Sequence, residues 1–108
     1  MIDRNFLQID GNTETVLKLE SVNERWNSFG WNVIDIDGHK IEEILDALKK
    51  ANETKNKPTV IILNTVKGKG VSFMENNVDF HGVPPNEMER DLAIKELNVE
   101  EKRLEALL

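Results

Sequence analysis

The stretch that decides the fold is Thr59-Val-Ile-Ile-Leu-Asn-Thr-Val66. Its apolar residues are nearly continuous instead of alternating, which is typical of a strand buried on both faces within a parallel sheet. Pro58 and the polar residues 53–57 separate it from the preceding segment. We therefore expect a central parallel strand here.

Two segments upstream complete a βαβ unit around this strand. Residues 31–37, Trp-Asn-Val-Ile-Asp-Ile-Asp, are rich in β-branched side chains and run into Gly38, as a strand that ends in a tight turn does. From Ile41 to Asn52, apolar residues recur at the three- and four-residue intervals of an amphipathic helix. The sequence therefore predicts an α/β fold, with a partial parallel sheet flanked by helices.

The regions on either side give more local signals. Residues 2–10 predict a short strand before a turn at residues 10–12, where Asp-Gly-Asn tolerates positive φ. Ser21 with Glu24 three residues later forms a capping-box pattern, which predicts a short helix ending at Gly30.

The C-terminal third combines a long loop with helix signals. After Lys67 the chain has about twenty residues without a clear period, a length at which a loop is usually functional or flexible. Asn-x-x-Glu patterns at Asn86 and Asn98 then predict two short helices.

Length and composition limit the class of protein. The 108 residues suit one domain, residues 1–108, and the formal net charge of -6 lacks the basic surface that binding to nucleic acid or an anionic membrane requires. The chain has no cysteine, which excludes disulfides and thiolate chemistry. It has no pattern of a signal peptide or a membrane span, so we expect a cytoplasmic protein.

Three positions could carry chemistry. The loop Lys67-Gly-Lys-Gly70 has the glycines and a lysine that a phosphate-binding loop needs, although by itself the pattern favours a purely structural glycine turn. His81 lies in a loop, where an imidazole can transfer a proton or hydrogen-bond a polar substrate. Asn5 could offer an oxygen to Mg²⁺ or serve only in a turn.

The other histidine, His39, is given no functional role. We expect it to be a surface residue near the start of a helix.

Taken together, the motifs resemble transketolase, and specifically the second half of its N-terminal, pyrophosphate-binding domain. The resemblance follows the chain in order, through residues 5–11 (Asn-Phe-Leu-Gln-Ile-Asp-Gly), 29–39, 57–62, 65–76 and the His81-Gly-Val-Pro motif. It implies transfer of a two-carbon ketol unit between phosphorylated sugars, with thiamine diphosphate and Mg²⁺ as cofactors.

The resemblance also implies roles for individual residues. Asn5 resembles the asparagine that binds Mg²⁺ through its side-chain oxygen, and Leu7 the position whose carbonyl completes the metal shell. Ile9 resembles a residue lining the thiamine. Lys67 and His81 resemble a lysine and a histidine close to the cofactor and the sugar, which makes His81 the predicted catalytic residue.

The resemblance further implies that the family's Gly-Asp-Gly segment belongs upstream of Asn5, so we expect a partial domain that is inactive without complementary chains. We also expect the loop from Lys67 to His81 to be mobile without cofactor. Two alternatives stay open. One is part of another thiamine-diphosphate enzyme, such as 1-deoxyxylulose-5-phosphate synthase or a keto-acid dehydrogenase component. The other is a non-catalytic α/β assembly or binding module, which could form a homo-oligomer.

Overall fold

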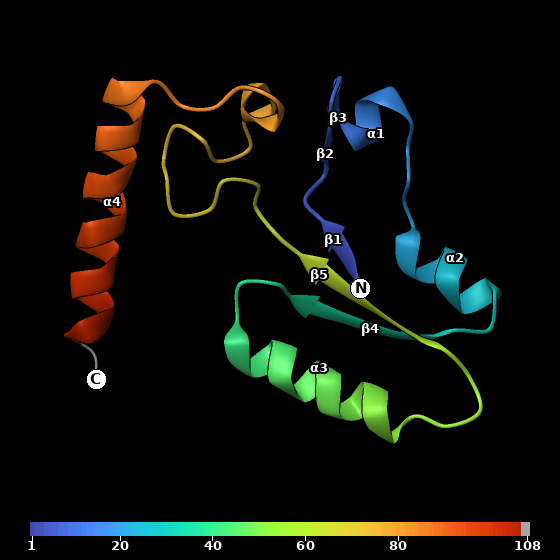
Figure 1. The fold of residues 1–108 in the computed structure, drawn as a ribbon. Helices are drawn as coiled ribbons and strands as arrows, with labels where there is room; N and C mark the ends of the chain where they lie inside the picture. The colour runs from blue at the N-terminus through green and yellow to red at the C-terminus, as the bar shows by residue number, and fades with distance from the viewer. Residues whose placement is uncertain (107–108) are drawn as a thin grey trace. The chain divides into compact units, whose positions relative to one another are not determined.

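The computed structural model describes residues 1–106, which form two compact units. The first unit consists of Met1–Phe6 and Gly11–Thr65. The second consists of Leu7–Asp10 and the described residues from Val66 onward. Figure 1 labels the helices and strands in chain order.

A three-stranded parallel sheet forms the centre of the first unit. Its strands are β1 (Ile2–Arg4), β4 (Asn32–Asp37) and β5 (Thr59–Asn64), in the order β1-β5-β4. β5 pairs in parallel with both neighbours, as Figure 1 shows. The predicted α/β class and the central position of the Thr59 strand are therefore confirmed.

The middle of β5 forms the core of this unit. Val60, Ile61 and Ile62 are only 3%, 5% and 1% exposed, because β5 has a strand on each side and side chains pack against both of its faces. This burial explains why the apolar run is continuous in the sequence.

The register places polar residues together at the carboxyl ends of the strands. Asn64 of β5 pairs with Arg4 of β1 on one side and with Asp37 of β4 on the other. Paired positions of a parallel sheet point to the same face, so these three side chains form a row across it. That edge is where open α/β sheets commonly bind ligands.

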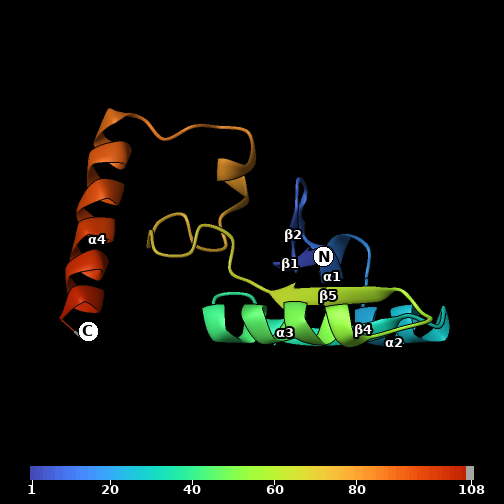
Figure 2. The ribbon, with the colours of Figure 1, turned by 60° about the horizontal axis from the view of Figure 1, so that its bottom comes forward.

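Helices α2 (Val22–Ser28) and α3 (Ile41–Glu53) both pack against β4. Figure 2 shows α3 lying lengthwise along the sheet. The predicted cap of α2 is confirmed, because Ser21 Oγ accepts a hydrogen bond from the Glu24 N–H at 3.3 Å. α3 buries Ala47 on its inner face.

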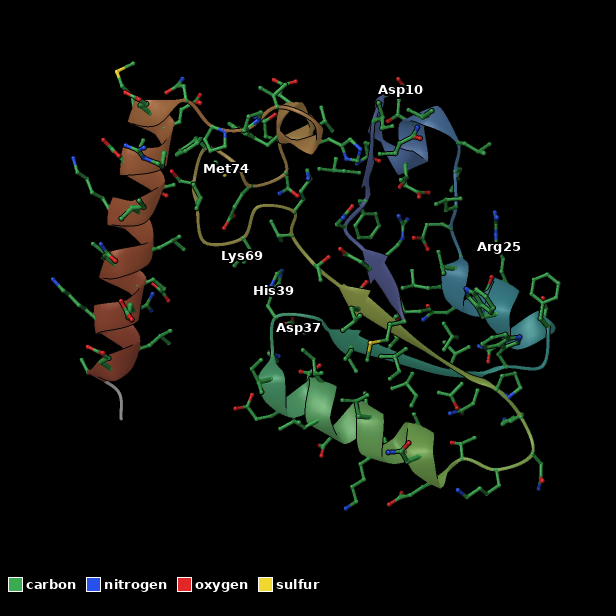
Figure 3. The ribbon with its side chains drawn as sticks, viewed as in Figure 1. Asp10, Arg25, Asp37, His39, Lys69 and Met74 are labelled. Atoms are coloured by element: carbon green, nitrogen blue, oxygen red, sulfur yellow. The ribbon has the colours of Figure 1, made fainter. Side chains whose placement is uncertain are left out.

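The turn between β4 and α3 is tightly packed. A β-carbon at Gly38 would lie 2.5 Å from Thr65 Cγ2, so only glycine fits there. Asp37 accepts a hydrogen bond from the His39 N–H at 2.9 Å, and Figure 3 shows both residues on this turn. His39 is exposed at the start of α3, as predicted.

The N-terminal region is more broken than the sequence predicts. Instead of one strand over residues 2–10, β1 ends at Arg4, and the backbone bends at Phe6, whose φ is 61°. The pattern of apolar residues cannot show that one residue, Phe6, has a backbone conformation in the left-handed region. The short elements that follow are β2 (Leu7–Gln8), β3 (Gly11–Asn12) and α1 (Thr13–Val16).

In the second unit, a loop and a 3₁₀ turn, η1 (Val78–His81), lead to helix α4 (Glu87–Glu105). Asn86 and Glu89 form the predicted capping box at its N-terminus. The prediction of two helices was wrong, because α4 continues through Asn98. An Asn-x-x-Glu pattern caps a helix only where the asparagine backbone is extended, and the pattern does not encode this.

None of the helices in residues 1–106 is long and apolar enough to cross a membrane.

Candidate functional site

The loop after β5 forms a closed turn. The Asn76 N–H donates to the Lys67 carbonyl at 2.9 Å and so joins its two ends. Gly68 and Gly70 have φ values of 75° and 96°, which L side chains rarely adopt. Figure 3 shows Lys69 and Met74 on this loop. The glycines are therefore needed for the shape of the loop itself.

The two lysines of this loop differ in their surroundings. Lys69 Nζ lies 3.4 Å from Glu75 Oε1, which also accepts a hydrogen bond from the Gly70 N–H at 3.1 Å. Within residues 1–106, the half-buried Lys67 side chain has no hydrogen-bond or ion-pair partner. Lys67 is thus the lysine available to bind an anion.

His81 ends η1, whose position depends on aromatic packing and a cap. The rings of Phe73 and Phe80 meet edge to face, with 5.7 Å between their centroids. Asn77 Oδ1 accepts from the Asp79 N–H at 3.0 Å and caps η1. These contacts fix the turn, while the His81 imidazole itself is exposed.

A pocket of about 300 Å³ lies in the same region. It is lined by Phe73, Asn77, Asp79, Phe80, Val83 and Glu89. The pocket is bounded by the aromatic pair that supports η1, so it lies among the residues next to His81 in sequence.

The predicted site residues divide between the two units. Leu7, Ile9, Lys67 and His81 all belong to the second unit, although some 60 residues separate the two motifs. Ile9 is 70% exposed and is thus open to contact with another molecule. Asn5 belongs to the first unit.

Arg4 is a residue of the first unit that sequence reasoning missed. It is 5% exposed, and its guanidinium donates to Thr13 Oγ1 at 2.9 Å, to Glu14 Oε1 at 2.6 Å and to Glu20 Oε1 at 2.7 Å. The sequence gives no clear signal for its burial, because Arg4 stands between the polar residues Asp3 and Asn5 and an arginine is rarely buried without partners.

The same cluster shifts the pKa values of Glu14 and Arg4. Burial by itself raises the pKa of Glu14, but hydrogen bonds from Arg4 and from the Leu19 N–H outweigh it, and the pKa is lowered. Burial likewise acts to lower the pKa of Arg4, but Glu20 and Glu14 outweigh it, and the pKa is raised. Both groups are therefore charged at neutral pH.

Beside this cluster lies a second pocket, of about 290 Å³. It is lined by Arg4, Phe6, Glu20, Ser21, Val22, Asn23, Asp35, Ile62 and Asn64. Asp35 accepts hydrogen bonds from Asn23 and Asn64 across it. The pocket therefore opens at the polar carboxyl edge of the sheet.

The described residues contain no group of three or more His, Cys, Asp or Glu side chains that could hold a metal ion. The donors predicted for Mg²⁺ are an asparagine side-chain oxygen and a main-chain carbonyl, both hard oxygen ligands of the kind that Mg²⁺ uses together with phosphates and water. Their chemistry fits Mg²⁺, but as part of a shell that needs further ligands.

Comparison with known proteins gives a consistent result. A family model described as "Transketolase, thiamine diphosphate binding domain" matches residues 1–105. An apulose-4-phosphate transketolase subunit of Phocaeicola vulgatus is 40% identical over 97% of this chain and 37% of its own length. The 6-deoxy-6-sulfo-D-fructose transketolase subunit of a Clostridium species is 42% identical over 91% of this chain and 36% of its own length.

Solved structures agree with these matches. Transketolase from Campylobacter jejuni superposes with a TM-score of 0.81 at 32% identity, covering 89% of this chain and 15% of the other. The chain thus spans a little over a third of the curated relatives described above. The fold, the family model and the relatives together assign this chain to the transketolase family, within its thiamine-diphosphate-binding domain.

Proposed function

We propose that this chain is part of a transketolase that transfers a two-carbon ketol unit between phosphorylated sugars, acting in the cytoplasm with complementary chains. The observation that carries the proposal is the grouping of Leu7, Ile9, Lys67 and His81 in one compact unit, in which the Lys67 ammonium has no partner among the described residues. The names of two relatives, which describe them as transketolase subunits, support the expectation of complementary chains.

In this proposal the cofactor is held by residues from both motifs. Asn5 contributes its side-chain oxygen and Leu7 its carbonyl to Mg²⁺, and Ile9 contacts the thiamine. Lys67 supplies a positive charge, which suits a diphosphate or a sugar phosphate because an ammonium binds phosphate as a point charge. Thiamine diphosphate, when bound, supplies the electron sink for cleaving a carbon–carbon bond.

His81 is the proposed catalytic residue. Its imidazole is exposed, so it can hydrogen-bond a hydroxyl of the sugar or exchange a proton with it. The Phe73–Phe80 contact and the Asn77 cap stabilise the turn that carries the imidazole.

The proposal is tested by titrating thiamine diphosphate with Mg²⁺ into the chain by calorimetry, with and without the complementary transketolase polypeptide. We expect weak or no binding to the chain alone, because few Mg²⁺ ligands come from it, and clear binding to the mixture. We expect ketol transfer between phosphorylated sugars only in the mixture. Absence of binding and activity in the mixture would refute the proposal.

The lysines of the loop provide a matched pair of variants for this titration. Lys67→Ala removes the ammonium available to an anion and should weaken binding of the ligand phosphate by roughly 10- to 100-fold, the usual effect of losing a charge-assisted contact. Lys69→Ala removes a lysine already paired with Glu75 and should leave binding within about threefold of the wild type. Equal effects of the two variants would argue against the role of Lys67.

The alternative of a non-catalytic assembly module has an observation of its own. On α3, Ile41, Leu45 and Leu48 are 64%, 62% and 40% exposed at helical spacing, which gives an exposed apolar stripe. Light scattering of the chain alone would detect self-association. A stable homo-oligomer that binds no thiamine diphosphate, even with the complementary polypeptide, would favour this alternative.

A member of another thiamine-diphosphate subfamily, such as a 1-deoxyxylulose-5-phosphate synthase, would also bind the cofactor. A transketolase and such a synthase are separated by supplying the mixture with an aldose phosphate as acceptor, together with either a ketose phosphate or a 2-keto acid as donor. Turnover of the keto acid and not of the ketose phosphate would favour the other subfamily.

A further inference from the structure

Arg4 is held in one position by three partners. Its Nη1 donates to Thr13 Oγ1 at 2.9 Å, and its Nη2 lies 2.6 Å from Glu14 Oε1 and 2.7 Å from Glu20 Oε1. The carboxylates balance the buried positive charge, and the contacts fix the guanidinium plane. These contacts engage both terminal nitrogens, whereas the buried Nε has no hydrogen-bond partner within residues 1–106.

The ring of Phe6 lies over this fixed guanidinium, with Arg4 Cζ 3.9 Å from the ring centroid. This is the geometry of a cation–π contact. Phe6 can contact Arg4, two residues before it, because the chain bends between them. The bend lies at Phe6 itself, whose φ is 61°. The positive φ disfavours any L residue, so the ring contact helps to hold a conformation that phenylalanine would otherwise avoid.

Asn5 lies between these two residues, and main-chain hydrogen bonds anchor it on both sides. The Arg4 carbonyl accepts from the Thr65 N–H at 3.3 Å, beyond the end of β5. The Phe6 carbonyl accepts from the Thr13 N–H at 2.8 Å. Thr13 therefore binds both the Arg4 side chain and the Phe6 main chain, and links the two anchors.

From this arrangement we propose that Arg4 and Phe6 are positioning residues for Asn5. Their stacked side chains hold the bend that sets the direction of the Asn5 side chain, and so prepare its oxygen for Mg²⁺. This inference rests on the proposed function, because it takes Asn5 to be a metal ligand. A neutral amide oxygen binds Mg²⁺ weakly by itself, so the orientation fixed before binding contributes to affinity.

The test substitutes Phe6, because removing Arg4 would leave two carboxylates without their cation and endanger folding. Phe6→Leu keeps an apolar side chain but removes the aromatic face. Phe6→Tyr keeps the face and serves as the conservative variant. Phe29→Leu is the matched control, since Phe29 is 76% exposed and belongs to the same unit.

The first measurement is amide hydrogen exchange in the chain without cofactor. Exchange of the Thr13 N–H, which is bonded to the Phe6 carbonyl, reports on the bend. We expect Phe6→Leu to accelerate this exchange by about tenfold or more relative to Phe6→Tyr and Phe29→Leu. Unchanged exchange in Phe6→Leu would overturn the role of the ring.

The second measurement is the Mg²⁺ concentration needed for thiamine diphosphate to bind the chain mixed with its complementary polypeptide. We expect Phe6→Leu to raise this concentration by roughly tenfold, with Phe6→Tyr and Phe29→Leu close to the wild type. A purely structural role would change thermal stability without changing the Mg²⁺ requirement. If wild type and Phe6→Leu need the same Mg²⁺ concentration, the positioning role is overturned but the proposed function stands. If the wild type does not bind thiamine diphosphate at all, both the positioning role and the proposed function are overturned.

Discussion

Gly68 lies directly against the main chain of Met74: a β-carbon at Gly68 would be 2.4 Å from the Met74 carbonyl oxygen and 2.6 Å from its carbonyl carbon. Neither atom can move without moving the backbone of the loop. The close approach, together with the φ of 75° at Gly68, determines how the turn after Lys67 closes.

Gly68→Ala should therefore open this turn. Positive φ alone costs about 1–2 kcal/mol for an alanine, and the clash with Met74 adds to it. The Asn76 N–H, bonded to the Lys67 carbonyl, should exchange faster, which NMR can measure. Gly82→Ala is the control, because Gly82 has a φ of -127° and a β-carbon there would meet nothing within 4 Å. Comparable exchange in both variants would contradict the steric argument.

The single helix α4 gives a second prediction, based on two asparagines with the same local pattern. Asn86→Ala should destabilise α4 by about 1 kcal/mol, because it removes the side chain that accepts from the Glu89 N–H. Asn98→Ala should instead raise helix content slightly, since alanine favours a helix interior. Circular dichroism and urea unfolding measure both effects. A loss of helix in Asn98→Ala would support two separate helices.

Burial of β5 sets the third prediction. Ile62→Ala should lower the free energy of unfolding by about 2–5 kcal/mol, because Ile62 is 1% exposed and truncation leaves a cavity in the sheet core. Leu45→Ala, at a position 62% exposed, should change it by less than about 0.5 kcal/mol. Chemical denaturation of both variants decides between a packed and a loose core around β5.

Because the pKa of Glu14 is lowered, the free energy of unfolding should decrease as the pH falls into the acid range. A carboxyl whose pKa is lowered by folding stabilises the native state above its ordinary pKa, which is 4.5 for Glu. That stabilisation is lost as the pH falls through the lowered value. The wild type should therefore be more stable than Glu14→Gln at pH 7, and the two should converge as the pH falls below the ordinary pKa and through the lowered one. If the difference in stability between wild type and Glu14→Gln did not vary with pH, this ionic contribution would be excluded.

The contact between Ser72 and Glu96 links the loop to α4. Glu96 accepts from the Ser72 N–H at 2.6 Å and from its hydroxyl at 2.7 Å. Glu96→Ala should cost about 1 kcal/mol and speed exchange of the Ser72 amide. Glu100→Ala removes only an exposed pair with Arg103 at 3.6 Å and is the control. Equal exchange of the Ser72 amide in both would contradict this link.

The sequence by itself determined the features that depend on local pattern. Burial and capping each require particular residue types at particular positions, so they can be recognised in the sequence. This is why the sequence predicts β5 from its continuous apolar run, α3 from its helical spacing, and two helix starts from the caps at Ser21 and Asn86. The motifs around Asn5, Lys67 and His81 also indicated the family correctly. The roles of these residues remain predictions.

Only the tertiary structure decided the remaining features, because they depend on residues distant in sequence. Arg4 has no periodic signal, and its two glutamates become partners only when the chain folds back across β1. The bend at Phe6 depends on one positive φ that residue type does not encode. Lys67 and Lys69 look alike in sequence, and the fold distinguishes them by pairing Lys69 with Glu75.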